Sequence, residues 1–182
     1  MSADAGRKQA VKILATYAPA LDVFGDTLAS TKVDKVYTGY GGHQVNNVDM
    51  YCSNAPTTFR SAIEQSKNTV ATWVMDEDVT PEYAYNFLTE RFGFTTLVPS
   101  DQVISLAIGG ITNGVTNLEL TNAFAALANG GIYTKPVLYT KVVDHDGNVI
   151  INNEVSETHQ AVKASTAYLL TSAMEDVVSG SR

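Results

Sequence analysis

The residues whose spacing most suggests chemistry are Ser66 and Asn68, in the stretch IEQSKNTVATWV at residues 63–74. They interrupt the polar face of a segment whose apolar residues recur at helical spacing. These apolar residues are Phe59, Ala62, Ile63, Val70, Trp73 and Val74. A serine hydroxyl becomes reactive only beside a group that takes its proton. Serine and asparagine are also common where helices are interrupted, because their side chains bond to nearby backbone. The triplet alone does not distinguish a catalytic site from an ordinary helix interruption.

Other residue types that could do chemistry lack partners at a useful spacing. Cys52 is the single cysteine, so an internal disulfide and a Cys-x-x-Cys metal site are both excluded. Gly109-Gly110 has neither the spacing nor the following lysine of a phosphate loop, which favours tight backbone packing. Three histidines stand in expected loops or beside a turn, without ligand spacing: His43, His145 and His159. We expect no metal and no organic cofactor.

Composition predicts one globular domain. The chain has 182 residues, 45% of them apolar, which is enough for a core. Its net charge of −7 comes from 19 acidic and 12 basic residues without a basic run, which excludes nucleic acid as a partner. No window is long and apolar enough to span a membrane, and residues 1–9 lack the apolar stretch of a signal peptide. We expect a soluble chain without a targeting segment of its own.

The first third of the chain reads as a helix followed by an irregular stretch. QAVKILATYAPAL has helical spacing that Pro19 disturbs, so we expect a buried helix ending near Asp22. Residues 23–56 are rich in Gly, Asn, Asp and Tyr and predict a long loop-rich excursion with one or two short strands. Such excursions often line functional sites. Three tyrosines in it could line a groove or simply anchor the surface: Tyr37, Tyr40 and Tyr51.

The rest of the chain predicts helices, a hairpin and a last helix. Helical signals run from about 57 to 75, and a further helix begins with Thr80 as cap and Pro81 and ends at Gly93. Thr116 and Glu119 form a capping box before a helix at 118–128, which is apolar nearly all round and is expected to be buried on more than one side.

Two further signals complete the pattern. Asp146-Gly147 separates two β-branched runs and predicts a type I′ hairpin, and Ser165 can cap a final helix. Strands and helices do not alternate as in a parallel sheet, so we expect an α+β, mainly helical fold.

Four blocks of sequence together resemble the transpeptidase domain of class A, bifunctional penicillin-binding proteins. They are KILATYAPALD at 12–22, TTFRSAIEQSKNTVA at 57–71, SLAIGGITNGVTNLELTNAFAALANGGIYTKP at 105–136, and VVDHDGNVI followed by STAYLLTSAMEDVV. Their order and approximate spacing match the family, and the third block is the most specific. A class A β-lactamase fits less well, because nothing here is similar to its deacylating glutamate region.

The resemblance implies a specific chemistry. In this family a serine attacks a D-Ala-D-Ala peptide, an amine from a neighbouring peptide resolves the acyl-enzyme, and β-lactams acylate the same serine. The motifs are Ser-x-x-Lys, Ser-x-Asn and Lys-Thr-Gly. By this resemblance Lys12 is the lysine of the first motif, Ser66 is a relay hydroxyl and Asn68 orients the substrate. The reaction needs no metal or organic cofactor.

The sequence departs from the family at two of the three motifs. Gln9 stands three residues before Lys12, where the nucleophilic serine is expected, and an amide cannot form the acyl-enzyme. The chain ends at VVSGSR without a Lys-Thr-Gly triplet. We therefore expect residues 1–182 to form a single partial transpeptidase domain that lacks most of the central antiparallel sheet, with residues 1–11 as a foreign or rearranged start.

Two functions remain open at this point. One is a fragment of a peptidoglycan D,D-transpeptidase that is inactive as this chain. Its parent would be anchored in the bacterial cell membrane, acting on its extracytoplasmic side on stem peptides and binding β-lactams. The other is a non-catalytic binding or scaffold module with a degenerate penicillin-binding fold. In either case an uncovered apolar face predicts self-association.

Overall fold

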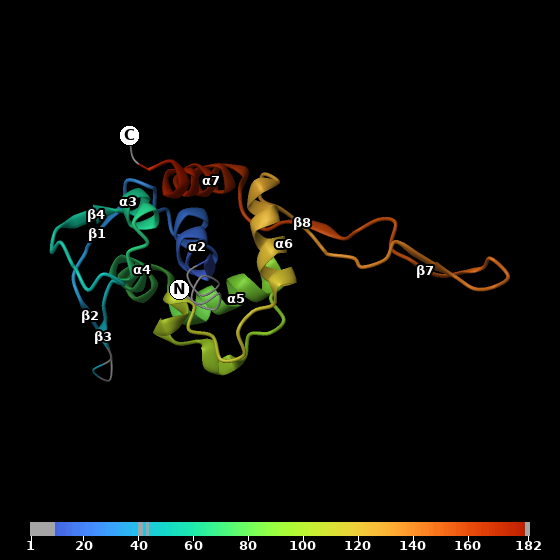
Figure 1. Cartoon of the computed structure of the whole chain (residues 1–182), viewed down its shortest axis with the longest axis horizontal. Coiled ribbons are helices and arrows are strands. Elements are labelled where there is room, and N and C mark those ends of the chain that lie inside the picture. The colour runs from blue at the N-terminus through green and yellow to red at the C-terminus, as the bar shows by residue number, and fades with distance from the viewer. Residues whose placement is uncertain (1–9, 40–41, 43, 181–182) are drawn as a thin grey trace.

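Helices form the body of the molecule, and a long two-stranded arm projects from it (Figure 1). The computed structural model describes residues 10–39, 42 and 44–180. The helical elements are the π-helices η1 (Ile13–Tyr17) and η3 (Met75–Val79), the 3-10 helices η4 (Pro99–Asp101) and η5 (Ile104–Ile108), and the α-helices α2 (Ala18–Asp22), α3 (Phe59–Glu64), α4 (Asn68–Val74), α5 (Pro81–Phe92), α6 (Asn117–Ala128) and α7 (Ala164–Ser179).

The strands pair antiparallel as four separate two-stranded sheets among the described residues. The pairs are β1 (Thr31–Val33) with β4 (Pro56–Thr58), β2 (Tyr37–Thr38) with β3 (Gln44–Val45), β5 (Ile132–Thr134) with β8 (Thr158–Gln160), and β6 (Lys141–Val143) with β7 (Val149–Asn152). The first two pairs belong to the excursion, and the last two form the arm. The architecture is α+β and mainly helical, and the excursion contains more strand than predicted.

The segment at residues 10–22 is the central helix of the body. It runs through η1 and α2 and ends at Asp22, as predicted. Pro19 does not break it, because the π-turn of η1, closed by the bond from Ala18 N to the Ile13 carbonyl, directly precedes the proline and interrupts the regular α-helical hydrogen bonding there. Leu14 and Tyr17 are fully buried. Helices α4, α5 and α7 and the shorter η3 and η5 pack against this segment.

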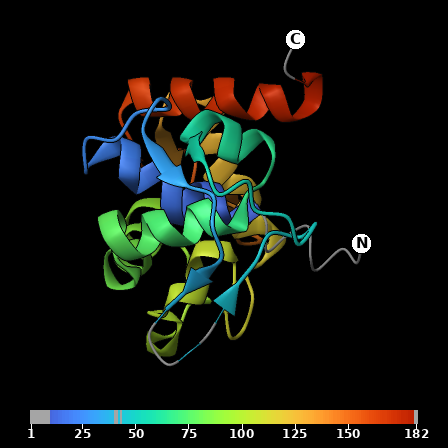
Figure 2. The ribbon, with the colours of Figure 1, turned by 90° about the vertical axis from the view of Figure 1, so that its left-hand side faces the viewer.

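Helix α7 crosses one side of the body and packs on α2, α3 and α6 (Figure 2). Its first residue follows Lys163, so the predicted cap at Ser165 is wrong. The capping acceptor comes instead from Asp22, whose Oδ1 accepts from Lys163 N at 2.7 Å and from Thr166 Oγ1 at 2.9 Å. A carboxylate at the end of the central helix therefore holds the start of α7.

The helix signals in the middle of the chain are confirmed. The Thr80 side chain accepts from Tyr83 N at the start of α5, and Gly93 ends the helix in the left-handed region with φ +66. The capping box of Thr116 and Glu119 is present at the start of α6. The expected burial of α6 on several sides is wrong. Its buried residues are Ala123, Ala126 and Leu127. Leu118 is 51% exposed, so α6 packs by one face.

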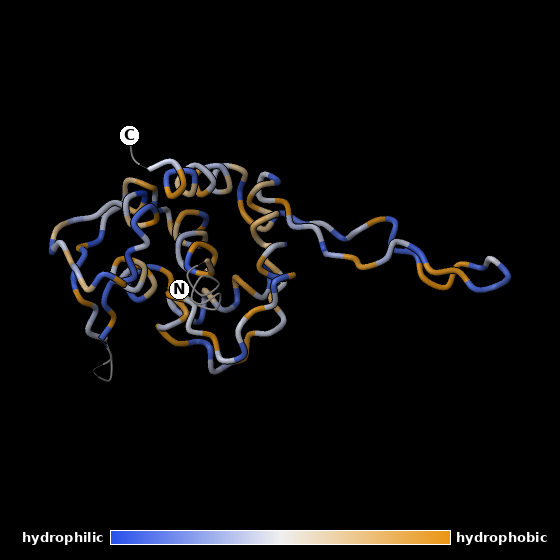
Figure 3. Tube along the Cα trace, in the orientation of Figure 1, coloured by the Kyte–Doolittle hydropathy of each residue, from blue (hydrophilic) through white to orange (hydrophobic). Residues whose placement is uncertain are grey.

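The arm is a hairpin, but its turn is not type I′. That turn requires positive φ at both central residues, whereas only Gly147 of the predicted pair has it, at +85. Residues 144–148 form a longer connection in which Asp144 Oδ1 accepts from the N–H groups of Asp146 and Asn148. Figure 3 shows apolar residues along this arm, and Ile150 is 64% exposed. Among the described residues, no helix has both the length and the apolar character to cross a membrane.

Candidate functional site

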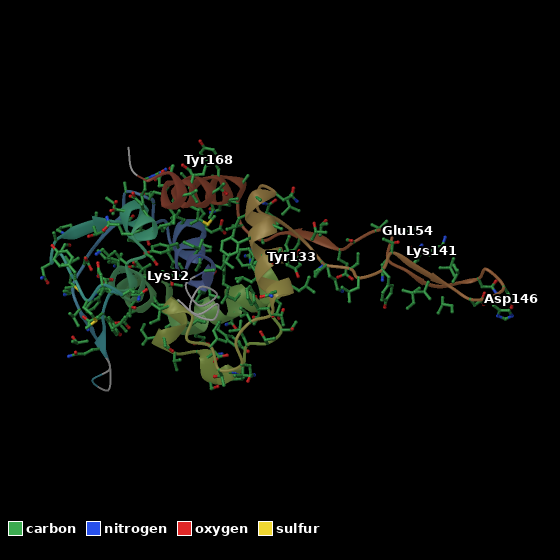
Figure 4. The ribbon with its side chains drawn as sticks, viewed as in Figure 1. Lys12, Tyr133, Lys141, Asp146, Glu154 and Tyr168 are labelled. Carbon is green, nitrogen blue, oxygen red and sulfur yellow. The ribbon has the colours of Figure 1, made fainter. Side chains whose placement is uncertain are left out.

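The structure brings Lys12, Ser66 and Asn68 together inside the body of the molecule. Lys12 lies just before η1 and is only 2% exposed, and Figure 4 places it in the interior. Its Nζ donates to Asn68 Oδ1 at 2.6 Å, to Ser66 Oγ at 3.1 Å and to the Ser66 carbonyl at 3.1 Å. An ammonium group has three donors, so these three acceptors can satisfy it completely. Gln9 lies outside the described residues.

Burial changes the acidity of this lysine. Removal from water lowers the pKa of Lys12 to about 8, because the charged form loses its hydration. Within the described part of the chain, no carboxylate forms an ion pair with Lys12 that would oppose this effect. At pH 7 about a tenth of the Lys12 amines are then neutral, against fewer than about one in a thousand for an ordinary lysine. The amine can therefore accept a proton from a neighbouring hydroxyl.

Ser66 lies at a true break between two helices. Helix α3 ends at Glu64 and α4 begins at Asn68, and Ser66 has a left-handed backbone with φ +54. This conformation is uncommon for a residue with a side chain. It lets Ser66 present both its hydroxyl and its carbonyl oxygen to Lys12. The predicted interruption is thus a sharp turn that directs the polar groups inward.

The apolar positions around this break form part of the core, with one exception. The predicted residues that are buried are Phe59, Ala62, Ile63, Val70 and Val74. Trp73 was expected to be buried with them, but it is half-buried and lies against the excursion. Its ring packs edge-on against Tyr37 at 4.8 Å between centroids, and Lys35 Nζ lies 4.6 Å from the ring.

The excursion tyrosines are not equivalent. Tyr37 is buried beneath Trp73, which makes it a core residue. Tyr51 is 63% exposed, with Lys67 Nζ 5.4 Å from its ring centroid. Tyr40 lies outside the described residues. Tyr51 also lines a hollow of about 390 Å³ between the excursion and the helix break, together with Asp34, Gln65 and Lys67.

A set of buried polar residues beside the site was missed by the sequence analysis. Asp34 is fully buried, and Asn47, Lys67 and Thr69 are also buried. Burial alone would raise the pKa of Asp34, but hydrogen bonds from Thr69, the Ser53 N–H and Asn47, with the charge of Lys67, lower it to about 2. The only signal for this set in the sequence was the length of an irregular stretch that had to be anchored somewhere.

The other candidate residues have structural environments. His159 lies in β8 rather than a loop, where its ring packs on Tyr133 at 5.0 Å and its Nε2 lies 2.9 Å from the Arg91 carbonyl oxygen. His145 is exposed beside Asp146, whereas His43 lies outside the described residues. In the described ranges, no three His, Cys, Asp or Glu side chains gather as a metal site would require.

Cys52 and the glycine pair also have structural environments. Cys52 is a free, half-buried thiol, and its Sγ accepts from Asn47 Nδ2 at 3.7 Å. A Cβ on Gly110 would lie 2.7 Å from the Ser105 side chain, which confirms the prediction of tight packing for Gly110. Gly109 instead ends η5 in the left-handed region, with φ +78.

Comparison with known proteins identifies the family of this chain. The family model of the penicillin-binding protein transpeptidase domain matches residues 11–182. Penicillin-binding protein 1A of Clostridium perfringens is 32% identical over 184 residues, covering 93% of this chain and 26% of the relative. Penicillin-binding protein 1F of Bacillus subtilis is 30% identical over 167 residues, covering 92% and 22%. The chain thus spans about a quarter of the length of these curated relatives.

Solved structures show the same fold. A peptidoglycan synthetase from Bifidobacterium adolescentis superposes with a TM-score of 0.77 at 22% identity, covering 94% of this chain and 34% of that one. The penicillin-binding protein PonA1 from Mycobacterium tuberculosis gives 0.77 at 20% identity, covering 93% and 47%. These are the type of protein that the sequence blocks resemble, and the chain belongs to the penicillin-binding protein transpeptidase domain family.

Proposed function

We propose that this chain is part of a peptidoglycan D,D-transpeptidase, in which Lys12, Ser66 and Asn68 transfer protons and position the substrate. The parent enzyme would cross-link D-Ala-D-Ala stem peptides through a serine acyl-enzyme, on the extracytoplasmic side of the bacterial membrane, and would react with β-lactams. The observation that carries this proposal is the set of three hydrogen bonds from buried Lys12 to Ser66 and Asn68.

The geometry supports a division of roles. In its neutral form Lys12 would accept the proton of a serine hydroxyl one helical turn before it, which makes that hydroxyl nucleophilic. Ser66 Oγ, 3.1 Å from Lys12 Nζ, would carry the proton on to the leaving amine. Because Asn68 Oδ1 accepts from Lys12, we assign its amide nitrogen to donation to the peptide carbonyl of the substrate.

This chain by itself would not complete the reaction. Gln9 occupies the position of the nucleophile, and an amide side chain forms no acyl-enzyme. The site would thus hold the proton-transfer groups without the attacking group. Gln9 at this position would also suit a non-catalytic binding module. The experiment must distinguish that function from a transpeptidase.

A chimera tests the proposal. Residues 11–182 would replace the matching segment of Clostridium perfringens penicillin-binding protein 1A, so that the relative supplies the serine and the Lys-Thr-Gly strand. We expect a fluorescent penicillin to label this chimera. Lys12→Met should slow labelling about 100-fold or more, the usual range for losing a general base.

Lys141→Met is the matched control, because Lys141 lies on the exposed arm away from the site. It should leave labelling unchanged. A folded chimera that no penicillin labels, or one in which Lys12→Met and Lys141→Met behave alike, would overturn the proposal and favour the non-catalytic module.

A further inference from the structure

Asp34 is the most completely hydrogen-bonded side chain beside the site. It lies directly after β1 and is fully buried. Its Oδ1 accepts from Thr69 Oγ1 at 2.6 Å and from Asn47 Nδ2 at 2.8 Å. Its Oδ2 accepts from Ser53 N at 3.0 Å and lies 3.4 Å from Lys67 Nζ. A buried carboxylate needs such partners, and two of these partners belong to the segment that carries the site.

The side chains of the consecutive residues 67, 68 and 69 point to different partners. Asn68 directs its Oδ1 to Lys12. Lys67 and Thr69, its two neighbours, direct their side chains to Asp34 instead. The backbone that carries Asn68 is therefore held on both flanks by one carboxylate from the excursion.

Asn47 adds a contact of the same kind. The residue before α4 is Lys67, whose side chain makes no capping bond, because an ammonium cannot accept one. Thr69 N, one of the donors left free at a helix start, donates to Asn47 Oδ1 at 3.2 Å. Since Asn47 in turn donates to Asp34, the start of α4 is capped from the excursion.

The left-handed Ser66 ends α3 as a Schellman cap, in which Lys67 N donates to the Ala62 carbonyl at 2.8 Å and Ser66 N to the Ile63 carbonyl at 3.1 Å. The contacts of Asp34 with Lys67, Thr69 and Asn47, called the clamp below, hold the chain directly after this cap. We propose that Asp34 is a positioning residue, which holds Ser66 and Asn68 against Lys12 through Lys67, Thr69 and Asn47. The inference rests on the proposed function for its catalytic meaning, but the geometry it claims can be tested without catalysis.

The test is an NMR titration of the Lys12 side chain in this chain, with ¹³C-labelled lysine and Lys12→Met to identify the signal. The wild-type signal should titrate near pH 8. In Asp34→Asn an amide N–H₂ donor would replace the Oδ2 acceptor that now faces Lys67 Nζ and Ser53 N. These contacts should be lost, and the residues after Ser66 should move away from Lys12. The Lys12 midpoint should then rise by at least one pH unit, toward the ordinary 10.5, as water reaches the amine.

Asp101→Asn is the matched control. Asp101 is also buried, at 1% exposed, and accepts from the Val98 and Thr112 backbone and from Thr112 Oγ1. Its loss should lower stability without moving the Lys12 midpoint. A milder pair serves if Asp34→Asn does not fold: Thr69→Val should raise the midpoint, and Thr69→Ser, which keeps the hydroxyl, should not.

The outcomes separate the two proposals. If folded Asp34→Asn and Thr69→Val both leave the Lys12 midpoint where it is in the wild type, or if Asp101→Asn moves it equally, the positioning role is wrong. Because the titration uses no penicillin, a negative titration would not affect the proposed function, which is tested by labelling of the chimera. A chimera that is not labelled would overturn the proposed function while the titration still reported on the clamp.

Discussion

The Lys12 amine donates to Asn68 Oδ1 across 2.6 Å although 56 residues separate the two in sequence. The contact joins the start of the central helix to the start of α4, so it forms only when the body has folded. The same burial that brings the groups together removes the ammonium from water, and this couples the chemistry of the site to the stability of the fold.

The first prediction concerns pH and Lys12. Because its folded pKa, about 8, lies below the ordinary 10.5, the unfolded chain binds more protons between these values, and stability rises with pH there. The free energy of unfolding of the wild type, relative to Lys12→Met, should increase by about 3 kcal/mol between pH 7.5 and 10.5. Urea unfolding at several pH values measures this.

Lys32 provides a control of opposite sign. Its burial would lower its pKa, but hydrogen bonds and charges from Glu77 and Asp78 raise it overall. A raised lysine pKa gives stability that is lost as pH rises through the folded value. The difference in free energy of unfolding between the wild type and Lys32→Met should therefore shrink at high pH. If the Lys12 and Lys32 differences changed with pH in the same direction, the conclusion that burial lowers the pKa of Lys12 would be refuted.

The second prediction concerns acid. The pKa of Asp34 is lowered to about 2, against burial, by its donors and Lys67. A lowered carboxyl pKa gives stability that is present above the ordinary value of 3.8 and lost as pH falls through 2. The free energy of unfolding of the wild type should exceed that of Asp34→Asn at pH 5, and this difference should be about 2 kcal/mol smaller at pH 2. A gap that stays constant over this range, in urea unfolding, would contradict the assignment.

The sequence predicted the elements better than their contacts. Thr80, Gly93 and the Thr116–Glu119 box mark helix ends by local chemistry, and these predictions were confirmed. The capping of α7 by Asp22 could not be predicted, because Asp22 and its partner Thr166 lie 144 residues apart in the sequence. The turn at Asp146-Gly147 was mistaken because the Asp144 carboxylate, outside the dipeptide, organises it.

The candidate site shows the same division. Lys12, Ser66 and Asn68 were proposed from a resemblance, and the fold brings them within hydrogen-bond distance. Asp34 carries no motif, and nothing in a single sequence marks a carboxylate in a loop as buried. Its role depends on where the excursion returns to the body.

The third prediction concerns the attachment of α7. Asp22→Ala would leave the Lys163 N–H and the Thr166 hydroxyl without their acceptor. Loss of a buried acceptor and a cap should reduce the free energy of unfolding by about 2 kcal/mol. Hydrogen exchange should show faster exchange at the start of α7. Thr166→Ser keeps the hydroxyl and should behave as the wild type; exchange that is unchanged in Asp22→Ala would contradict the capping role.

The fourth prediction concerns self-association. Tyr168 and Val178 of α7 are 73% and 91% exposed, and Figure 4 shows Tyr168 directed away from the body. Exposed apolar faces tend to find partners. We expect light scattering to show association at high concentration, and the double variant Tyr168→Lys and Val178→Lys to reduce it. A monomeric wild type under these conditions would contradict this expectation.

The proposal that this chain holds the proton-transfer groups of a transpeptidase without its nucleophile can be tested by its intact mass after incubation with excess penicillin. We expect no added mass on the chain itself and one penicillin on the chimera that regains the serine. One penicillin on the unmodified chain would contradict the placement of Gln9 at the nucleophile position, and the site would then have to be built around the modified residue.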